Sequence, residues 1–198
     1  ISGAMVGEAP LDKWVSTDGA KPGDDIIFTK TAAIEGTFLL ASNYEDELSD
    51  KLNPGSVEKA KNFLKKMSVV KDAATAMESG EVHAMHDPTE GGLVGGIHEL
   101  ADASEVGFSI NSDSVKISKI TNEICDYFDI DPLKTIGSGS LLICCDPKDT
   151  ENIVRALKER DIPATKIGEI LESKEDRLMD GKKLEFPGQD ELWRIFKT

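Results

Sequence analysis

The residues best suited to chemistry lie in the segment 81–100, which reads EVHAMHDPTEGGLVGGIHEL. His86 and Asp87 can supply a proton-transfer group and a group that orients it, and Asp87 with Glu90 can hold a hard cation such as Mg²⁺. Adjacent residues of a strand point to opposite faces, so the strand must end before His86 and Asp87 can cooperate. None of these spacings is specific to one reaction.

Two glycine pairs follow at once, Gly91 with Gly92 and Gly95 with Gly96. Each glycine inside a helix costs about 1 kcal/mol relative to alanine, so the pattern predicts that something approaches this helix closely. The approaching group is either another segment of the chain or a ligand whose phosphate or carboxylate oxygens rest on backbone N–H groups.

A purely structural alternative exists for the same corner, because Asp-Pro occurs three times, at Asp87, Asp131 and Asp146. Asp can cap a helix and Pro can occupy its first position, and at Asp87 and Asp146 an acid follows three residues later. The helix-start interpretation therefore stays open at Asp87 and is strongly favoured at Asp146.

The elements that must position these residues alternate along the chain. Apolar residues at 82, 84 and 85 predict a strand before the corner, and Leu93, Ile97 and Leu100 predict a helix after it. Two further corners, residues 29–36 (TKTAAIEG) and 135–140 (TIGSGS), combine hydroxyls with glycine beside a strand. Neither has the spacing of a Walker loop or of a dinucleotide-binding loop.

The remaining pattern predicts a mixed α/β (α+β) fold with helices packed on a mixed sheet, in a single domain over residues 1–198. An Asp180-Gly181 pair between two short alternating runs predicts a hairpin. We expect strands at 1–9, 25–29, 106–110, 141–145 and 164–170. We expect helices at 34–52, 57–67 with a Ser56 cap, 69–77, 117–128, after 146–149, and at 192–196.

Composition excludes several classes of protein. The formal net charge of -14 disfavours nucleic acid and anionic membrane surfaces as partners, although a local basic pocket for phosphate is compatible with it. No apolar run approaches the roughly 20 residues that span a bilayer. The chain begins with Ile1 and its first Met is Met5, so we expect a fragment of a longer protein.

Cysteine and histidine usage predicts no metal centre. Cys125, Cys144 and Cys145 lack the spacing of a zinc site or a disulfide framework, which indicates reduced thiols in a cytoplasmic protein. Cys144 and Cys145 should point to opposite faces of one buried strand. We expect His83 and His98 to be structural or surface residues.

Five short motifs, taken together and in order, resemble one family. The motifs are KPGDDIIFTK, IEGT, HDPTEGGL, TIGSGSLLI and KIGEI. The chain resembles, over nearly its whole length, the C-terminal domain of the aminoimidazole ribonucleotide (AIR) synthase superfamily. It is most similar there to HypE-like hydrogenase maturation factors and archaeal AIR synthase-related proteins.

The resemblance implies an enzyme that uses ATP and Mg²⁺, bound mostly by an N-terminal domain missing from this chain, usually as a homodimer. Such proteins activate an amide or related oxygen, or transfer phosphate, on a small-molecule or carrier-bound substrate. His86 and Asp87 would be catalytic. Substrate or phosphate contacts would come from this corner and from a second lip of the cleft, at Thr89, Glu90, Gly91, Gly92, Thr29, Glu35 and Gly36.

Two departures from the HypE pattern favour an AIR synthase-related paralogue whose substrate is unassigned. HypE-like proteins end in a cysteine that carries the reacting group, whereas this chain ends WRIFKT, and Glu35 stands before Gly36 where the pattern has His. The alternative is a non-catalytic module for dimerisation or for binding a partner in metalloenzyme maturation.

Overall fold

The strands form a mixed sheet. The computed structural model describes residues 4, 6–10 and 14–196, and within these the sheet has seven strands in the order β2-β4-β1-β5-β3-β6-β7. Neighbouring strands are antiparallel except β3 and β6, which are parallel. The strands are β1 (Asp25–Thr29), β2 (Val82–His86), β3 (Gly107–Ile110), β4 (Leu142–Cys145), β5 (Ala164–Leu171), β6 (Arg177–Met179) and β7 (Lys182–Lys183).

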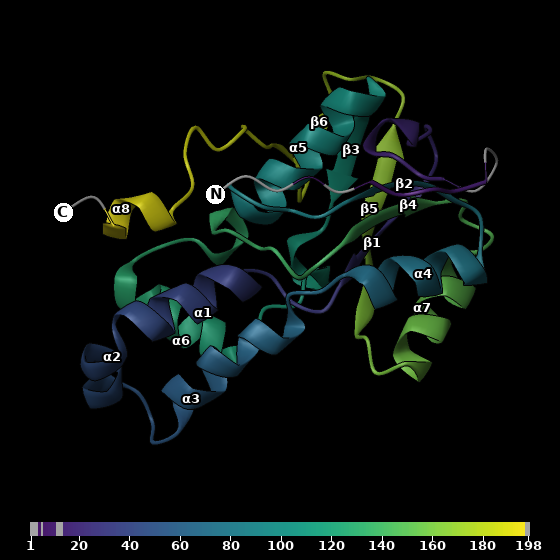
Figure 1. The fold of residues 1–198 in the computed structure, drawn as a ribbon. Coiled ribbons are helices and arrows are strands. Elements are labelled where there is room, and N and C mark those ends of the chain that lie inside the picture. Colours follow the sequence, from purple (N-terminus) through teal and green to yellow (C-terminus); the bar gives the residue numbers. More distant parts are fainter. Residues whose placement is uncertain (1–3, 5, 11–13, 197–198) are drawn as a thin grey trace.

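Helices cover both faces of the sheet (Figure 1). Helices α4 and α7 lie side by side on one face, α5 lies on the other, and α1, α2, α3 and α6 gather beyond one end of the sheet. The α-helices are α1 (Ile34–Asn43), α2 (Glu45–Lys51), α3 (Ser56–Lys61), α4 (Val70–Ser79), α5 (Gly92–Ser104), α6 (Lys119–Phe128), α7 (Thr150–Glu159) and α8 (Leu192–Phe196). The 3₁₀ turns are η1 (Thr17–Gly19), η2 (Asn62–Lys66), η3 (Ser112–Ser114) and η4 (Pro132–Lys134).

The central strands are buried on both faces, which explains why their sequences are apolar throughout. In β1, Ile26 packs into the cluster beneath α5 while Ile27 packs into the cluster beneath α4 and α7. Cys144 and Cys145 of β4 divide in the same way, so the prediction that they face opposite sides of one strand is confirmed.

A third apolar cluster joins the helices at the end of the sheet to the C-terminal helix. Leu40 of α1, Leu48 of α2, Ala60 of α3, Ile124 of α6 and Leu192 of α8 all belong to it. This cluster fixes the position of α1, whose first turn follows the corner after β1.

Two helices predicted as continuous are interrupted. The helix predicted over 34–52 breaks at Tyr44, and α2 begins afresh with three acidic residues in its first turn, which suits the positive end of a helix dipole. The helix predicted over 57–67 ends at Lys61 and continues as η2. There the Asn62 side-chain amide donates to the Glu58 carbonyl, a bond that competes with regular helix geometry.

Two predicted caps are wrong. Gly55, with φ 80°, occupies the cap position before α3, and Ser56 is the first residue of that helix. Asp146 does not start α7, which begins at Thr150. The Asp146 carboxylate instead accepts from the Lys148 backbone N–H and pairs with the Lys148 ammonium. Asp131 is the aspartate that does cap, accepting from the Leu133 N–H ahead of η4.

The predicted hairpin is confirmed. Strands β6 and β7 pair antiparallel around Asp180 and Gly181, whose φ values of 53° and 71° match the turn that suits a two-residue hairpin. Of the strand predicted at 1–9, residues 4 and 6–9 are irregular, and the others lie outside the described residues. Among the described helices, none combines the length and apolarity needed to cross a membrane.

Candidate functional site

One end of the sheet brings the three predicted corners together. Leu142, the first residue of β4, pairs with both Phe28 of β1 and His86 of β2. The chain therefore leaves β1, leaves β2 and enters β4 at the same end of the sheet. The three corners are far apart in the sequence, and they meet because antiparallel pairing places the end of one strand beside the start of another.

The loop over residues 135–140 connects the other two corners by backbone contacts. The Gly36 N–H donates to the Ile136 carbonyl at 3.0 Å, and the Gly137 N–H donates to the Thr89 carbonyl at 3.3 Å. A Cβ at Gly137 would lie 3.2 Å from the Pro88 carbonyl oxygen. The three corners are thus one continuous surface of the molecule.

The corner after β2 is an irregular turn and not a helix start. Helix α5 begins at Gly92 with Gly91 as its cap at φ 77°, so the helix-start interpretation left open for Asp87 is wrong. The chain must turn once more after Pro88 before it can enter the helix, and glycine allows that left-handed turn. Asp87 is thereby released from a capping role.

Three polar side chains project from this corner toward solvent. Asp87, Thr89 and Glu90 are exposed, and their side chains make no hydrogen bond or ion pair with any residue that the structure describes. Their oxygens are the groups of the corner that remain available to a ligand.

His86 lies at the end of β2 and has its own partner. Its Nε2 lies 2.7 Å from a carboxylate oxygen of Glu99 on α5. Glu99 was not foreseen, because its partner is 13 residues away and only the docking of α5 on the sheet brings them together. The cooperation of His86 with Asp87 stays a prediction, since the pair that the structure forms is His86 with Glu99.

The glycines behind the corner accommodate neighbouring backbone. A Cβ at Gly92 would lie 2.6 Å from the Thr135 carbonyl oxygen, and one at Gly96 would lie 2.7 Å from the Pro88 Cβ. Of the two explanations for the glycine pairs, close approach by another segment of the chain therefore holds at both positions.

Two backbone N–H groups of this turn, those of Gly91 and Gly92, are already paired. The Gly91 N–H donates to the Asp190 carboxylate at 2.6 Å, and the Gly92 N–H donates to the Thr89 carbonyl at 3.0 Å. The Asp190 side chain is buried, and this burial raises the pKa of its carboxyl group. No local signal in the sequence connects Asp190 with this corner.

Thr29, at the second lip, is part of a buried hydrogen-bond network. Its hydroxyl donates to Asp72 at 2.7 Å and accepts from the Leu141 N–H at 3.0 Å. Glu35 is half-buried in the first turn of α1, and its side chain has no partner among the described residues. Gly36 packs beneath Thr135, whose methyl would lie 2.4 Å from an added Cβ. Glu35 is therefore the group of this lip with free polar atoms.

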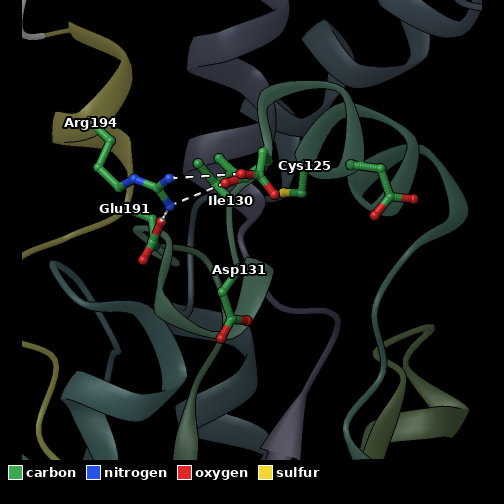
Figure 2. A pocket seen from close by; sticks show the side chains of 7 residues that line it. Cys125, Ile130, Asp131, Glu191 and Arg194 are labelled. Carbon is green, nitrogen blue, oxygen red and sulfur yellow. Dashed lines mark hydrogen bonds and ion pairs between the residues drawn. The ribbon is translucent and has the colours of Figure 1, made fainter.

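A separate hollow of about 360 Å³ lies between α6 and α8 (Figure 2). Its one cation is held within the hollow, since Arg194 pairs with Glu191 and donates to the Asp129 carbonyl. Burial raises the pKa of the Cys125 thiol on its wall to about 12. Within the described parts of the chain, no three His, Cys, Asp or Glu side chains gather as a metal site.

Comparison with known families agrees with this geometry. The family model described as AIR synthase related protein, C-terminal domain, matches residues 21–181. This chain belongs to that family. The match extends from the turn before β1 to the hairpin, so it includes all three corners of the candidate site.

Several relatives of this AIR synthase-related domain are named as hydrogenase expression/formation proteins or as carbamoyl dehydratases. The chain is 28% identical over 174 residues to "Putative hydrogenase expression/formation protein MJ0676" of Methanocaldococcus jannaschii, covering 86% of this chain and 48% of the relative. It is 24% identical over 164 residues to "Carbamoyl dehydratase HypE" of Rhizobium leguminosarum, covering 83% and 45%. The chain thus spans about half the length of the curated relatives it matches.

Solved structures share the fold. The crystal structure of Escherichia coli HypE superposes with a TM-score of 0.76 at 23% identity, over 96% of this chain and 57% of that one. HypE in complex with ATP gives 0.68 at 21% identity, over 94% and 57%, and a HypE–HypF complex gives 0.64 at 20%, over 88% and 55%. The predicted fold class, a mixed α/β domain of the AIR synthase type, is confirmed.

Proposed function

We propose that this chain is the C-terminal part of an ATP-dependent, HypE-like or AIR synthase-related enzyme that activates an amide or related oxygen. The observation that carries the proposal is that the exposed side chains of Asp87, Thr89 and Glu90 have no partner among the described residues, at the end of the sheet where the three corners meet. The names of a carbamoyl dehydratase relative and of a HypE–ATP complex support this chemistry.

The charges of the corner define what it can contact. Two carboxylates facing phosphate oxygens repel them unless a cation lies between, so Asp87 and Glu90 fit a Mg²⁺ ion shared with ATP. The Thr89 hydroxyl can donate directly to a phosphate or substrate oxygen. Positioning and electrostatic stabilisation would be the main catalytic contribution of this chain.

The other partners follow from the same proposal. An N-terminal domain would supply most of the ATP site across a homodimer in the cytoplasm, and the substrate would be a small molecule or a group on a carrier. His86, held by Glu99, would exchange a proton with that substrate. Gly91, Gly92, Thr29 and Gly36 would shape the cleft, and Glu35 would face it.

The test uses a protein that joins this chain to its ATP-binding domain. ATP hydrolysis is measured against Mg²⁺ concentration for the unmodified protein, for Asp87→Asn and for Glu90→Gln, with exposed Asp113→Asn as the matched control. We expect slower turnover and a higher Mg²⁺ requirement in the corner variants alone. Unchanged turnover in Asp87→Asn with every candidate substrate would reject the role of Asp87.

A second candidate function, partner binding in metalloenzyme maturation, is favoured by the HypE–HypF complex among the similar structures. It predicts that Thr89→Ala and Asp87→Asn leave partner binding unchanged. It also predicts that ATP gives residues 86–92 no added protection from hydrogen exchange.

A further inference from the structure

A cavity of about 850 Å³ lies where β1 ends, α4 begins and β5 begins. Seven of the chain's 23 lysine and arginine residues line it, against two carboxylates, Asp72 and Asp161. This concentration of positive charge is unexpected in a chain with a net charge of -14. Like charges repel, so a cluster of this kind costs free energy unless an anion offsets it.

Four of the seven cations make neither a side-chain hydrogen bond nor an ion pair with any described residue. They are exposed and come from three segments: Lys65 and Lys66 from η2, Lys116 from the loop before α6, and Lys158 from α7. Lys66 lies over the Phe63 ring, with its ammonium 3.9 Å from the ring centre. Partial desolvation, and secondly the charge of Lys30, lower the pKa of Lys66. The protein itself therefore leaves these ammonium groups uncompensated.

The other three cations that line the cavity are held in place by other parts of the chain. The Lys30 ammonium pairs with Asp72 at 3.0 Å and donates to the Gly139 carbonyl at 2.7 Å and the Ser68 carbonyl at 2.8 Å. Arg160 pairs with Glu78, and Lys71 donates to the Arg160 carbonyl. Three cations held in place beside four uncompensated ones are a partly preorganised arrangement for an anion.

The chemistry of the free groups selects phosphate over carboxylate. Lysine ammoniums are compact point charges that bind phosphate oxygens from many directions, whereas planar carboxylates are best matched by the arginine fork, and the one arginine here is already paired. Ile117, Ile162 and Pro163 add an apolar wall. We propose that this lysine-rich cavity binds an organic molecule that carries two or more phosphate groups.

This cavity is separate from the corner used in the proposed function. None of residues 86–92 lines it, although both lie at the same end of the sheet. Contact between the two runs through the loop 135–140, because Lys30 bonds Gly139 while Gly137 bonds Thr89. Binding here can be measured without ATP hydrolysis, so failure of one proposal leaves the other standing.

The test is calorimetric titration of the 198-residue chain with sodium tripolyphosphate at physiological ionic strength, with citrate and sulfate as comparison anions. We expect Lys66→Gln and Lys158→Gln each to weaken tripolyphosphate binding roughly tenfold, because each removes a charge-assisted contact. The matched control, Lys51→Gln with Lys182→Gln, removes two exposed lysines outside the cavity and should change the affinity less than twofold. Circular dichroism confirms that each variant is folded.

A second readout locates the ligand. Methyl resonances of Ile117 and Ile162 should shift on titration, while Ile124, buried in the cluster of α1 and α6, should not. The proposal is overturned if tripolyphosphate does not bind, if citrate or sulfate binds as tightly, or if the cavity variants bind like the control. An oligonucleotide that binds and is not displaced by tripolyphosphate would also overturn it.

Discussion

The Gly91 N–H, at the first turn of α5, donates a 2.6 Å hydrogen bond to the carboxylate of Asp190, 99 residues further along the chain. The same carboxylate accepts from the Leu192 N–H at 2.8 Å. A side chain from the C-terminal segment thus occupies the place where an anion would rest on this helix end. A phosphate contact through the Gly91 N–H stays a prediction, and it requires Asp190 to move away.

Removing the Asp190 carboxylate should destabilise the fold. In Asp190→Ala the buried N–H groups of Gly91 and Leu192 lose their acceptor, which costs about 1–3 kcal/mol of unfolding free energy. Urea denaturation measures the change, with Asp113→Ala as the control because Asp113 is exposed. A loss no larger than that of the control would show that this contact does not stabilise the C-terminal segment.

The pH dependence of stability should also report on Asp190. Burial raises the pKa of its carboxyl group above the ordinary value of 3.8, so its contribution to stability is fully present below 3.8 and is lost as the pH rises through the raised pKa. Asp190→Asn cannot ionise. The variant should therefore gain stability relative to the unmodified chain as the pH rises from below 3.8 through the raised pKa. A relative gain toward low pH would mean that hydrogen bonds to the ionised carboxylate outweigh its burial.

Gly92 should tolerate no side chain. Gly92→Ala combines a positive φ of 59° with a Cβ only 2.6 Å from the Thr135 carbonyl oxygen, and should cost roughly 3 kcal/mol. Gly55→Ala is the matched control, since Gly55 has φ 80° with no atom within 4 Å of the added Cβ, and should cost roughly 1–2 kcal/mol. Equal losses in thermal or urea unfolding would contradict close packing of α5 on the loop before β4.

The three cysteines should be unreactive in the folded chain. Burial raises the pKa of the Cys125 thiol to about 12 and that of Cys145 to about 11, and it raises the pKa of Cys144 well above its usual range. Because the thiolate is the reactive form, a disulfide reagent at about pH 8 should label none of them until denaturant is added. Rapid labelling of Cys144 or Cys145 in the native chain would argue against the buried placement of β4, and rapid labelling of Cys125 against that of α6.

The sequence predicted most element types correctly where the pattern was strong. The apolar runs of β1 and β4 fit strands buried on both faces, and Asp180-Gly181 fits only a tight hairpin. The sequence-based prediction failed where the same residues were compatible with either a helix cap or an irregular turn. Asp87, Asp131 and Asp146 all begin an Asp-Pro pair, yet of these three only Asp131 caps. The path of the chain into α5 and α7 decides where each of those helices begins.

By itself, the sequence determined the family, the mixed α/β class and the corner at residues 86–92, since motif order and hydrophobic period are local properties of the chain. Only the tertiary structure decided which distant residues contact one another. It paired His86 with Glu99, placed Asp190 on Gly91 and gathered lysines from three separate segments around one cavity. These contacts depend on how the strands pair and how the helices pack on them. The spacing of residues along the sequence does not show which distant residues will meet.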